Sequence, residues 1–205
     1  MHTRFFVFVL TLTFVMGCEN SEKKEAIIID KTQNHPVFIK LGLYPSFDQP
    51  AEVLINLEER YLLVYNASPY VYEKLNQAGG HDKIVDKQFS LSSKGNYSIV
   101  PFHSKLSIDE VNPIIQLING FSAKDYEVDL SKVMFDGMCY SYQILYSNNE
   151  FKEINPMNIP NKKQFQLSEM IIDLALDKNQ NDTNDSILGI VKGYQIPLQE
   201  KYKWE

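Results

Sequence analysis

Residues 37–65 read VFIKLGLYPSFDQPAEVLINLEERYLLVY, and the fold class follows from this stretch. Apolar residues alternate with other residues along 37–44 and again along 51–58, which is the period of two that a half-buried β-strand requires. Glu58-Glu59 is expected to turn the chain. Residues 60–65 are apolar on both faces, a pattern typical of a strand that is covered on both sides. The stretch therefore predicts three consecutive strands.

A fourth strand and a helix are predicted next. Residues 96–105 are predicted to form a strand that Pro101 interrupts, and because proline donates no backbone hydrogen bond, this strand is expected to lie at an edge or to be broken at Pro101. Ser107-Ile108-Asp109-Glu110 matches the capping box that opens a helix, and Asn119-Gly120 ends that helix. Pro113 should either bend the helix or mark the residue where it begins.

The remaining elements complete the fold class. Alternation over residues 138–146 and the Asn148-Asn149 turn predict a hairpin with residues 151–154. Residues 164–177 carry the clearest helical period in the chain. The order of strands, helix, hairpin and helix predicts an α+β fold, an antiparallel sheet with about two helices packed mainly on one face. We expect a single domain over residues 36–205.

The composition of the 205-residue chain excludes several classes of protein. Its 20 Lys and Arg are outnumbered by 26 Asp and Glu, so the net charge of −6 leaves no cationic excess to neutralise the phosphates of a nucleic acid. Two cysteines are too few for a disulfide-dense scaffold. The hydrophobic share of 44% is ordinary for a globular domain.

The N-terminal residues MHTRFFVFVLTLTFVMGCEN have the parts of an export signal. Arg4 provides a positive charge, and the apolar run over residues 5–16 is shorter than the ~20 residues that a membrane-spanning helix needs. Val15-Met16-Gly17-Cys18 resembles the lipobox of bacterial lipoproteins. The other interpretation is an ordinary secretory signal in which Cys18 is incidental.

The lipobox resemblance implies that the chain is cut before Cys18 and that the Cys18 thiol receives a diacylglycerol. Residues 1–17 are then a signal peptide that is removed, and residues 18–35 are the lipidated cysteine and a tether. Two or three acyl chains anchor a protein stably. We therefore expect a protein of the bacterial cell envelope, held to the outer membrane on its periplasmic or surface face. Cys139 remains as the only free thiol.

The histidines and Cys139 are the candidates for catalysis. No histidine is near Cys139 in sequence, although His35, His81 and His103 could approach it in space. A nucleophilic cysteine needs such a base, whereas a buried and inert thiol is the commoner case. His81 and His103 are both expected to be exposed to solvent. The chain lacks the ligand spacings of a zinc site, so no metal or other cofactor is predicted.

Residues 177–185 (DKNQNDTND) resemble the start of an EF-hand calcium loop. Oxygen-bearing side chains stand at its first, third, fifth and ninth positions. However, Asp182 stands where a glycine makes the sharp turn, and Leu188 replaces the bidentate glutamate. The competing interpretation is a solvated loop after a helix, and the sequence leaves both open.

Tyrosines form the most distinctive rows of side chains. Tyr140, Tyr142 and Tyr146 share one face of the strand predicted over residues 138–146, and Tyr61 and Tyr65 share a face of another strand. Such rows can stack sugar rings or form a contact patch for a protein partner. They can instead line the core, which is the favoured interpretation because a strand needs one apolar face to pack.

The favoured function is a non-catalytic binding domain anchored by lipid to the bacterial envelope. Its partner would be a protein, as for an immunity-type inhibitor, or a glycan, and the acidic charge would steer a basic partner. One alternative is an envelope hydrolase that uses His81 or His103 with carboxylates. Another is a structural lipoprotein of the outer membrane. No P-loop, G-x-G-x-x-G or G-x-S-x-G motif occurs in the chain.

Overall fold

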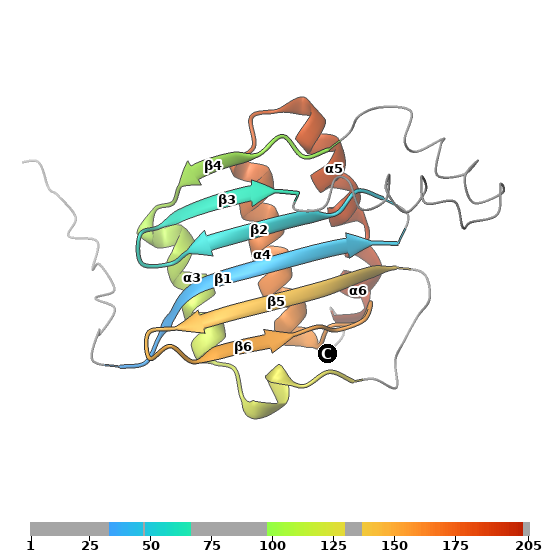
Figure 1. Ribbon diagram of the computed structural model, residues 1–205. Helices are drawn as coiled ribbons and strands as arrows, with labels where there is room; N and C mark the ends of the chain where they lie inside the picture. The colour runs from blue at the N-terminus through green and yellow to red at the C-terminus, as the bar shows by residue number, and fades with distance from the viewer. Residues whose placement is uncertain (1–32, 47, 67–97, 130–136, 203–205) are drawn as a thin grey trace, which may run out of the picture.

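The computed structural model describes residues 33–46, 48–66, 98–129 and 137–202 (Figure 1). Residues 1–32, with the predicted signal peptide, Cys18 and most of the predicted tether, lie outside the described residues, and so does His81. Within the described ranges, no helix is both long enough and apolar enough to cross a membrane.

The strands form one sheet in the order β4-β3-β2-β1-β5-β6, and every neighbouring pair is antiparallel. They are β1 (Pro36–Pro45), β2 (Ala51–Asn56), β3 (Tyr61–Tyr65), β4 (Phe102–Lys105), β5 (Met138–Tyr146) and β6 (Phe151–Ile154). The central strand β1 pairs with β2 on one side and with β5 on the other. The short strands β4 and β6 form the edges, and Pro101 directly precedes β4. The edge position predicted from Pro101 is confirmed.

The helices of the described residues lie on one face of this sheet, behind it in Figure 1. They are α3 (Ile108–Asn119), α4 (Lys162–Lys178), α5 (Asp182–Gly193) and α6 (Ile196–Tyr202). A short 3-10 helix, η1 (Ala123–Tyr126), lies beside the β6 edge. The predicted α+β class is therefore confirmed, with an antiparallel sheet and its helices on one face.

The alternation along each strand decides which side chains are buried under the helices. On β5, every second side chain from Met138 to Tyr146 is buried, and those between are only partly covered. On β3, Leu62 and Val64 are buried, whereas the other three residues are partly exposed. The expectation that residues 60–65 would be covered on both sides is wrong, because the described helices pack against one side of β3 only.

Helix α3 begins where the capping box predicts. The Glu110 N–H donates to Ser107 Oγ (3.3 Å), and the Ser107 N–H donates to Glu110 Oε2 (2.6 Å). Pro113 lies inside the helix, so the alternative in which the helix begins at Pro113 is wrong. The apolar stripe of α3 is buried in the core.

Residues 177–185 form neither of the two predicted loops. Helix α4 continues to Lys178, and α5 begins at Asp182 after an N-cap at Asn181. Ile187, Leu188 and Val191 of α5 are buried at helical spacing. Burial of this face overrides the preference of an Asn- and Asp-rich stretch for turns. The expectation of about two helices consequently missed α5 and α6.

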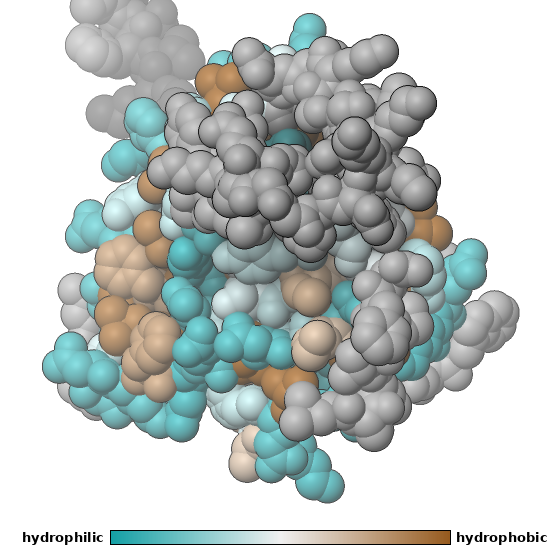
Figure 2. All heavy atoms as spheres, turned by 45° about the vertical axis from the view of Figure 1, so that its right-hand side comes forward, coloured by the Kyte–Doolittle hydropathy of each residue, from teal (hydrophilic) through white to brown (hydrophobic). Residues whose placement is uncertain are grey.

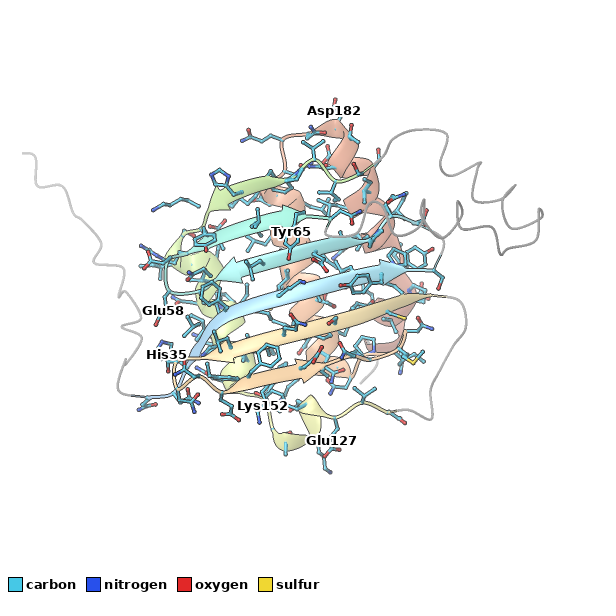
Figure 3. The ribbon with its side chains drawn as sticks, viewed as in Figure 1. His35, Glu58, Tyr65, Glu127, Lys152 and Asp182 are labelled. Carbon is cyan, nitrogen blue, oxygen red and sulfur yellow. The ribbon has the colours of Figure 1, made fainter. Side chains whose placement is uncertain are left out.

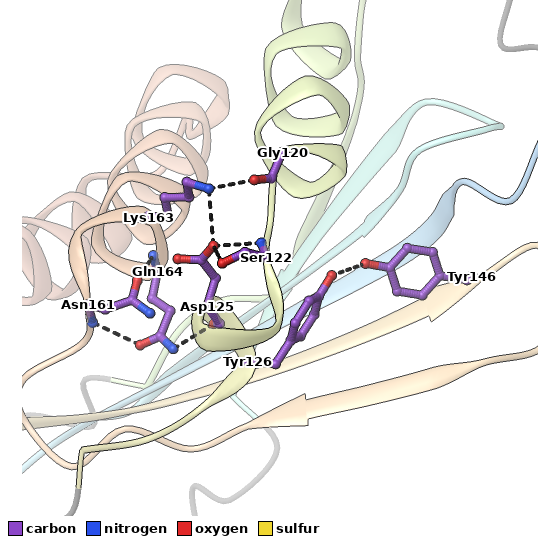
Figure 4. A network of polar contacts seen from close by, with 8 residues as sticks. All are labelled: Gly120, Ser122, Asp125, Tyr126, Tyr146, Asn161, Lys163 and Gln164. Carbon is purple, nitrogen blue, oxygen red and sulfur yellow. Dashed lines mark hydrogen bonds and ion pairs between the residues drawn. The ribbon is translucent and has the colours of Figure 1, made fainter.

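A junction of polar groups fixes the start of α4 against η1 (Figure 4). Gln164 is buried, and its Nε2 donates to the backbone oxygens of Asp125 (2.9 Å) and Glu127 (3.1 Å). The Asp125 carboxylate accepts from the Ser122 N–H and lies 3.1 Å from Lys163 Nζ. Burial raises the pKa of Asp125, but the bonds from Ser122 and Lys163 lower it more, so its pKa lies below the ordinary value. The carboxylate is thus held ionised between the helices.

Asn184 ties α5 to the residues that precede β4. Its side chain is fully buried, with 0% exposed. The Val100 N–H donates to Asn184 Oδ1 (2.8 Å), and Asn184 Nδ2 donates to the Val100 carbonyl (3.0 Å) and to Asn179 Oδ1 (3.1 Å). The Asn184 amide therefore binds two other segments, the residues before β4 and the link between α4 and α5.

We predict that Asn184→Ala lowers the free energy of unfolding by about 1–3 kcal/mol, because it removes these buried hydrogen bonds. Urea denaturation measures the loss. Ser186→Ala on the exposed side of the same helix is the matched control and should change stability by less than about 0.5 kcal/mol. Equal stabilities for the two variants would contradict a role of Asn184 in fixing α5.

Candidate functional site

The face of the sheet opposite the helices, which we call the open face, is turned toward the viewer in Figures 1 and 3. The register places Tyr65 of β3 opposite Glu52 of β2, and Glu52 opposite Gly42 of β1. Lys40 and Tyr44 stand two residues before and after Gly42, so they share its face. We call these five residues the Glu52 cluster.

Glu52 is the centre of the cluster, and its side chain is 7% exposed. Tyr44 Oη donates to Glu52 Oε1 at 2.6 Å. Lys40 Nζ lies 3.1 Å from Glu52 Oε2 and 5.9 Å from the centroid of the Tyr65 ring. The buried carboxylate thus accepts a hydrogen bond from a phenol on Oε1 and forms an ion pair with an ammonium on Oε2, although Oε2 itself accepts no hydrogen bond.

Gly42 makes room for the Tyr44 ring. A Cβ atom built on Gly42 would lie only 2.6 Å from Tyr44 Cε2 and Oη. The ring of Tyr44 therefore lies back over the glycine, which brings its hydroxyl to Glu52 on the neighbouring strand. Any larger residue at position 42 would displace Tyr44 from this hydrogen bond.

The electrostatics of the cluster hold each group in one protonation state. Burial raises the pKa of Glu52, but contacts with Tyr44, Lys40 and Tyr65 lower it further, and the net pKa lies below the ordinary value. Burial and the Glu52 carboxylate raise the pKa of both Tyr44 and Tyr65. Burial lowers the pKa of Lys40, but Glu52 raises it more, to above the ordinary value.

At neutral pH the cluster therefore contains one carboxylate, one ammonium and two neutral phenols. General acid–base catalysis is most efficient when a group titrates near the working pH. Here the pKa values of all four groups are shifted away from neutrality. The arrangement supplies fixed hydrogen-bonding groups and aromatic surface, which favours binding over proton transfer.

Apolar and aromatic side chains surround the cluster on the open face. Phe151 on β6 is the most exposed of them, at 55%. The others are partly buried: Phe38, Leu54, Tyr61, Leu63 and Leu145. Figure 2 turns the open face toward the left and shows apolar side chains gathered among hydrophilic ones there. The open face is thus an amphipathic surface and not a uniformly solvated one.

The row of Tyr140, Tyr142 and Tyr146, considered above as a partner patch, lies on the opposite face and is buried. The Tyr140 and Tyr142 rings are stacked with centroids 6.1 Å apart, and Tyr142 Oη donates to the Gln164 carbonyl (2.8 Å). Tyr146 Oη contacts the hydroxyl of Tyr126 (Figure 4). Helices cover this side of β5, so the row lines the core. Tyr65, labelled in Figure 3, and Tyr61 lie on the open face.

The structure separates Cys139 from the described histidines. Cys139 lies on the open face near the start of β5, where Asn158 Oδ1 is 3.9 Å from its Sγ. The His35 N–H donates to Ser147 Oγ, beyond the other end of β5. His35 Nε2 lies 2.9 Å from Glu58 Oε1, and Figure 3 shows these two residues at the same end of the sheet. His103 is on the edge strand β4, four strand spacings from β5, or about 19 Å at ~4.8 Å each. Neither histidine can serve Cys139 as a base.

Sequence reasoning did not identify the Glu52 cluster. The alternation assigned Glu52 and Lys40 to the polar faces of their strands, but pairing between these two strands depends on a register that the sequence pattern does not specify. A glycine in the middle of β1 was the available signal, since an interior strand glycine often marks the close approach of another group.

Comparisons with family models, with curated proteins and with solved structures find no match to this chain. Within the described residues, no group of three or more His, Cys, Asp or Glu side chains is arranged to hold a metal ion. Inference about function therefore starts from the open face and the Glu52 cluster.

We predict that Glu52→Gln lowers the pKa of Tyr44 and Tyr65 toward the ordinary tyrosine value, because the anion that opposes their ionisation is removed. Ultraviolet titration of the tyrosinate band measures the change, with Tyr44→Phe and Tyr65→Phe used to assign the two transitions. Glu153→Gln, an exposed change on β6, should leave the titration unchanged. Identical titrations for Glu52→Gln and the wild type would refute the proposed electrostatics.

Proposed function

We propose that this protein is a lipid-anchored, non-catalytic binding module of the bacterial envelope and that its open face holds a protein partner. The observation that carries the proposal is the open face itself, where partly exposed aromatic and aliphatic side chains from five strands surround the Glu52 cluster. The centres of protein interfaces are enriched in aromatic residues and depleted of charged ones. Lys40 and Glu52 are charged, but they pair with each other, so a partner that covers them would not bury an unpaired charge.

The charge of the domain favours a basic partner. Acidic side chains outnumber basic ones both in the whole chain and among the described residues. Such a field speeds the approach of a positively charged protein and disfavours an acidic one. A basic protein that arrives at the envelope, as the target of an immunity-type inhibitor would, is the partner class that we propose.

The anchor rests on the N-terminal sequence. Val15-Met16-Gly17-Cys18 has the order and spacing of a lipobox, and the apolar run before it is too short for a membrane-spanning helix. Lipidation of Cys18 would hold the open face within a tether's length of the membrane.

We predict that Cys18→Ala moves the protein from the membrane fraction to the soluble or secreted fraction, because the acyl chains have no other attachment. Fractionation followed by immunoblotting measures the shift. Cys139→Ala is the matched control and should stay with the membrane. Retention of Cys18→Ala in the membrane fraction would overturn the anchor but would leave the binding face to be tested separately.

We predict that a photo-crosslinking side chain placed at Leu145 or Phe151 captures a basic protein in native membranes. The same side chain at Asp173, exposed on α4, is the matched control and should capture far less of that protein. With the captured protein purified, Phe151→Glu should weaken its affinity at least about tenfold, since it replaces an exposed aromatic contact by an unpaired charge that the partner would bury.

Two results would contradict the proposal for the open face. In one, the crosslinks from Asp173 equal those from Leu145 and Phe151. In the other, the domain is retained on purified envelope polysaccharide in a manner that Phe151→Glu abolishes, which would identify a glycan as the partner instead.

A further inference from the structure

His35 lies directly before β1, where the chain enters the sheet, and its side chain is only 6% exposed. One ring nitrogen, Nδ1, lies 2.9 Å from the backbone oxygen of Gln33. The other, Nε2, lies 2.9 Å from Oε1 of Glu58, which belongs to the turn between β2 and β3. Figure 3 shows His35 and Glu58 at the same end of the sheet. The imidazole therefore joins the residues before β1 to the β2–β3 turn.

Both ring nitrogens of His35 face oxygen atoms that have no hydrogen to donate. The partner at Gln33 is a backbone carbonyl, and glutamate side chains are ionised acceptors at neutral pH. A neutral imidazole carries a single N–H, so it can donate to one of these oxygens but turns a lone pair toward the other. Only the imidazolium, which carries an N–H on each nitrogen, satisfies both contacts at once.

Glu58 is the group that offsets the cost of burying a charged ring. Burial by itself disfavours an imidazolium, whereas a carboxylate at hydrogen-bond distance favours it. Among the described residues, Glu58 is the only charged side chain that forms a hydrogen bond or ion pair with the ring. Glu59 and Arg60, the next residues of the same turn, are exposed. In the turn between β5 and β6, the Glu150 carboxylate pairs instead with Lys152 (2.6 Å).

The backbone of His35 is tied to a second turn. Its N–H donates to Ser147 Oγ (3.2 Å), and the Ser147 N–H donates to the His35 carbonyl (2.9 Å). The Asn148 N–H donates to Asn34 Oδ1 (3.3 Å). These bonds hold residues 34 and 35 to the β5–β6 turn and need no proton on the ring. The imidazole adds a separate attachment, on the β2 side of β1, that does need one.

We propose that His35 is a proton-dependent clasp, which holds residues 33–35 to Glu58 when the ring is protonated and releases Gln33 when the ring loses a proton. The neutral ring keeps its stronger, charge-assisted bond to the carboxylate, so the Gln33 carbonyl, which lies outside the sheet, is the partner that turns away. Because the fold favours the protonated ring, this attachment is present at low pH and is lost as the pH rises. The clasp is independent of the open face and of the proposed lipid anchor.

Glu58→Gln tests the clasp because an amide can donate a hydrogen bond as well as accept one. With this substitution, a neutral imidazole can donate to the Gln33 carbonyl through Nδ1 and accept from the new amide through Nε2. The variant should therefore hold residues 33–35 equally well at low and high pH. Glu59→Gln is the matched control, since it removes the same charge from the next, exposed residue of the turn.

The experiment measures amide hydrogen exchange of the purified full chain at pH 6 and pH 8.5, expressed as protection relative to an unfolded chain so that the intrinsic effect of pH cancels. In the wild type and in Glu59→Gln, we expect the protection of the His35 amide to fall about fivefold between these pH values, a factor typical of one hydrogen bond. In Glu58→Gln the fall should be absent. At pH 8.5 this variant should protect the amide better than the wild type does, which a merely structural role of Glu58 does not predict.

A second measurement reads the ring itself. In protein labelled with nitrogen-15 at histidine, His35 should show two ring N–H signals at pH 6 and at most one at pH 8.5, and His35→Gln assigns these signals by removing them. A single ring N–H on His35 at pH 6 would overturn the proposal. The same holds for a wild type whose protection does not fall with pH, or for a fall that Glu58→Gln and Glu59→Gln share. Circular dichroism of each variant checks that the fold is retained.

Discussion

The pairing of β1 with a strand on each side is the constraint on which the rest of the structure depends. Its alternation buries Ile39, Leu41 and Leu43 beneath the helices. The registers with β2 and β5 place buried residues of those strands opposite these three, so the same face is apolar on all three strands. A slip of one residue would place the apolar set in solvent, so the register is strongly specified. The side chains that alternate with these buried residues necessarily point to the open face. The polar centre of the open face, Lys40 beside Glu52, is therefore a consequence of how the buried face is packed.

Much of the fold could be predicted from the sequence because several signals are local. Alternation marks β1, β2 and β5, and the capping box at Ser107 marks the start of α3 to the residue. What escaped prediction depends on contacts between distant segments. Helix α5 follows an Asn- and Asp-rich stretch whose local preference is for turns, and Asn184 becomes helical while its amide binds Val100. Likewise, RYLLVY is apolar on both sides, and the sequence does not reveal that the described helices lie on only one of them.

The candidate site shows the same division between local and distant information. Each face of β5 carries residues that could lie either in the core or at the surface, so the sequence does not decide which face is buried. In the structure, the helices cover the face that carries the tyrosines. Tyr44 and Glu52 are eight positions apart in the chain, but their hydrogen bond requires the β1–β2 register and the absence of a side chain at Gly42. Sequence spacing cannot identify such a set, since its members become neighbours only across strands. The resulting centre combines opposite charges with two neutral phenols, which distinguishes it chemically from a proton-transfer site.

The central position of β1 also has a mechanical consequence. Any tension applied through the N-terminal side of the chain enters the sheet at Pro36 and acts along β1. The hydrogen bonds of an antiparallel pair run perpendicular to the strands, so this load shears the bonds to β2 and β5 together. A load on an edge strand would open its bonds one after another from a single end. If the domain is held at its N-terminus while a bound partner is pulled away, the force is therefore applied in shear, the direction in which the sheet resists unfolding most.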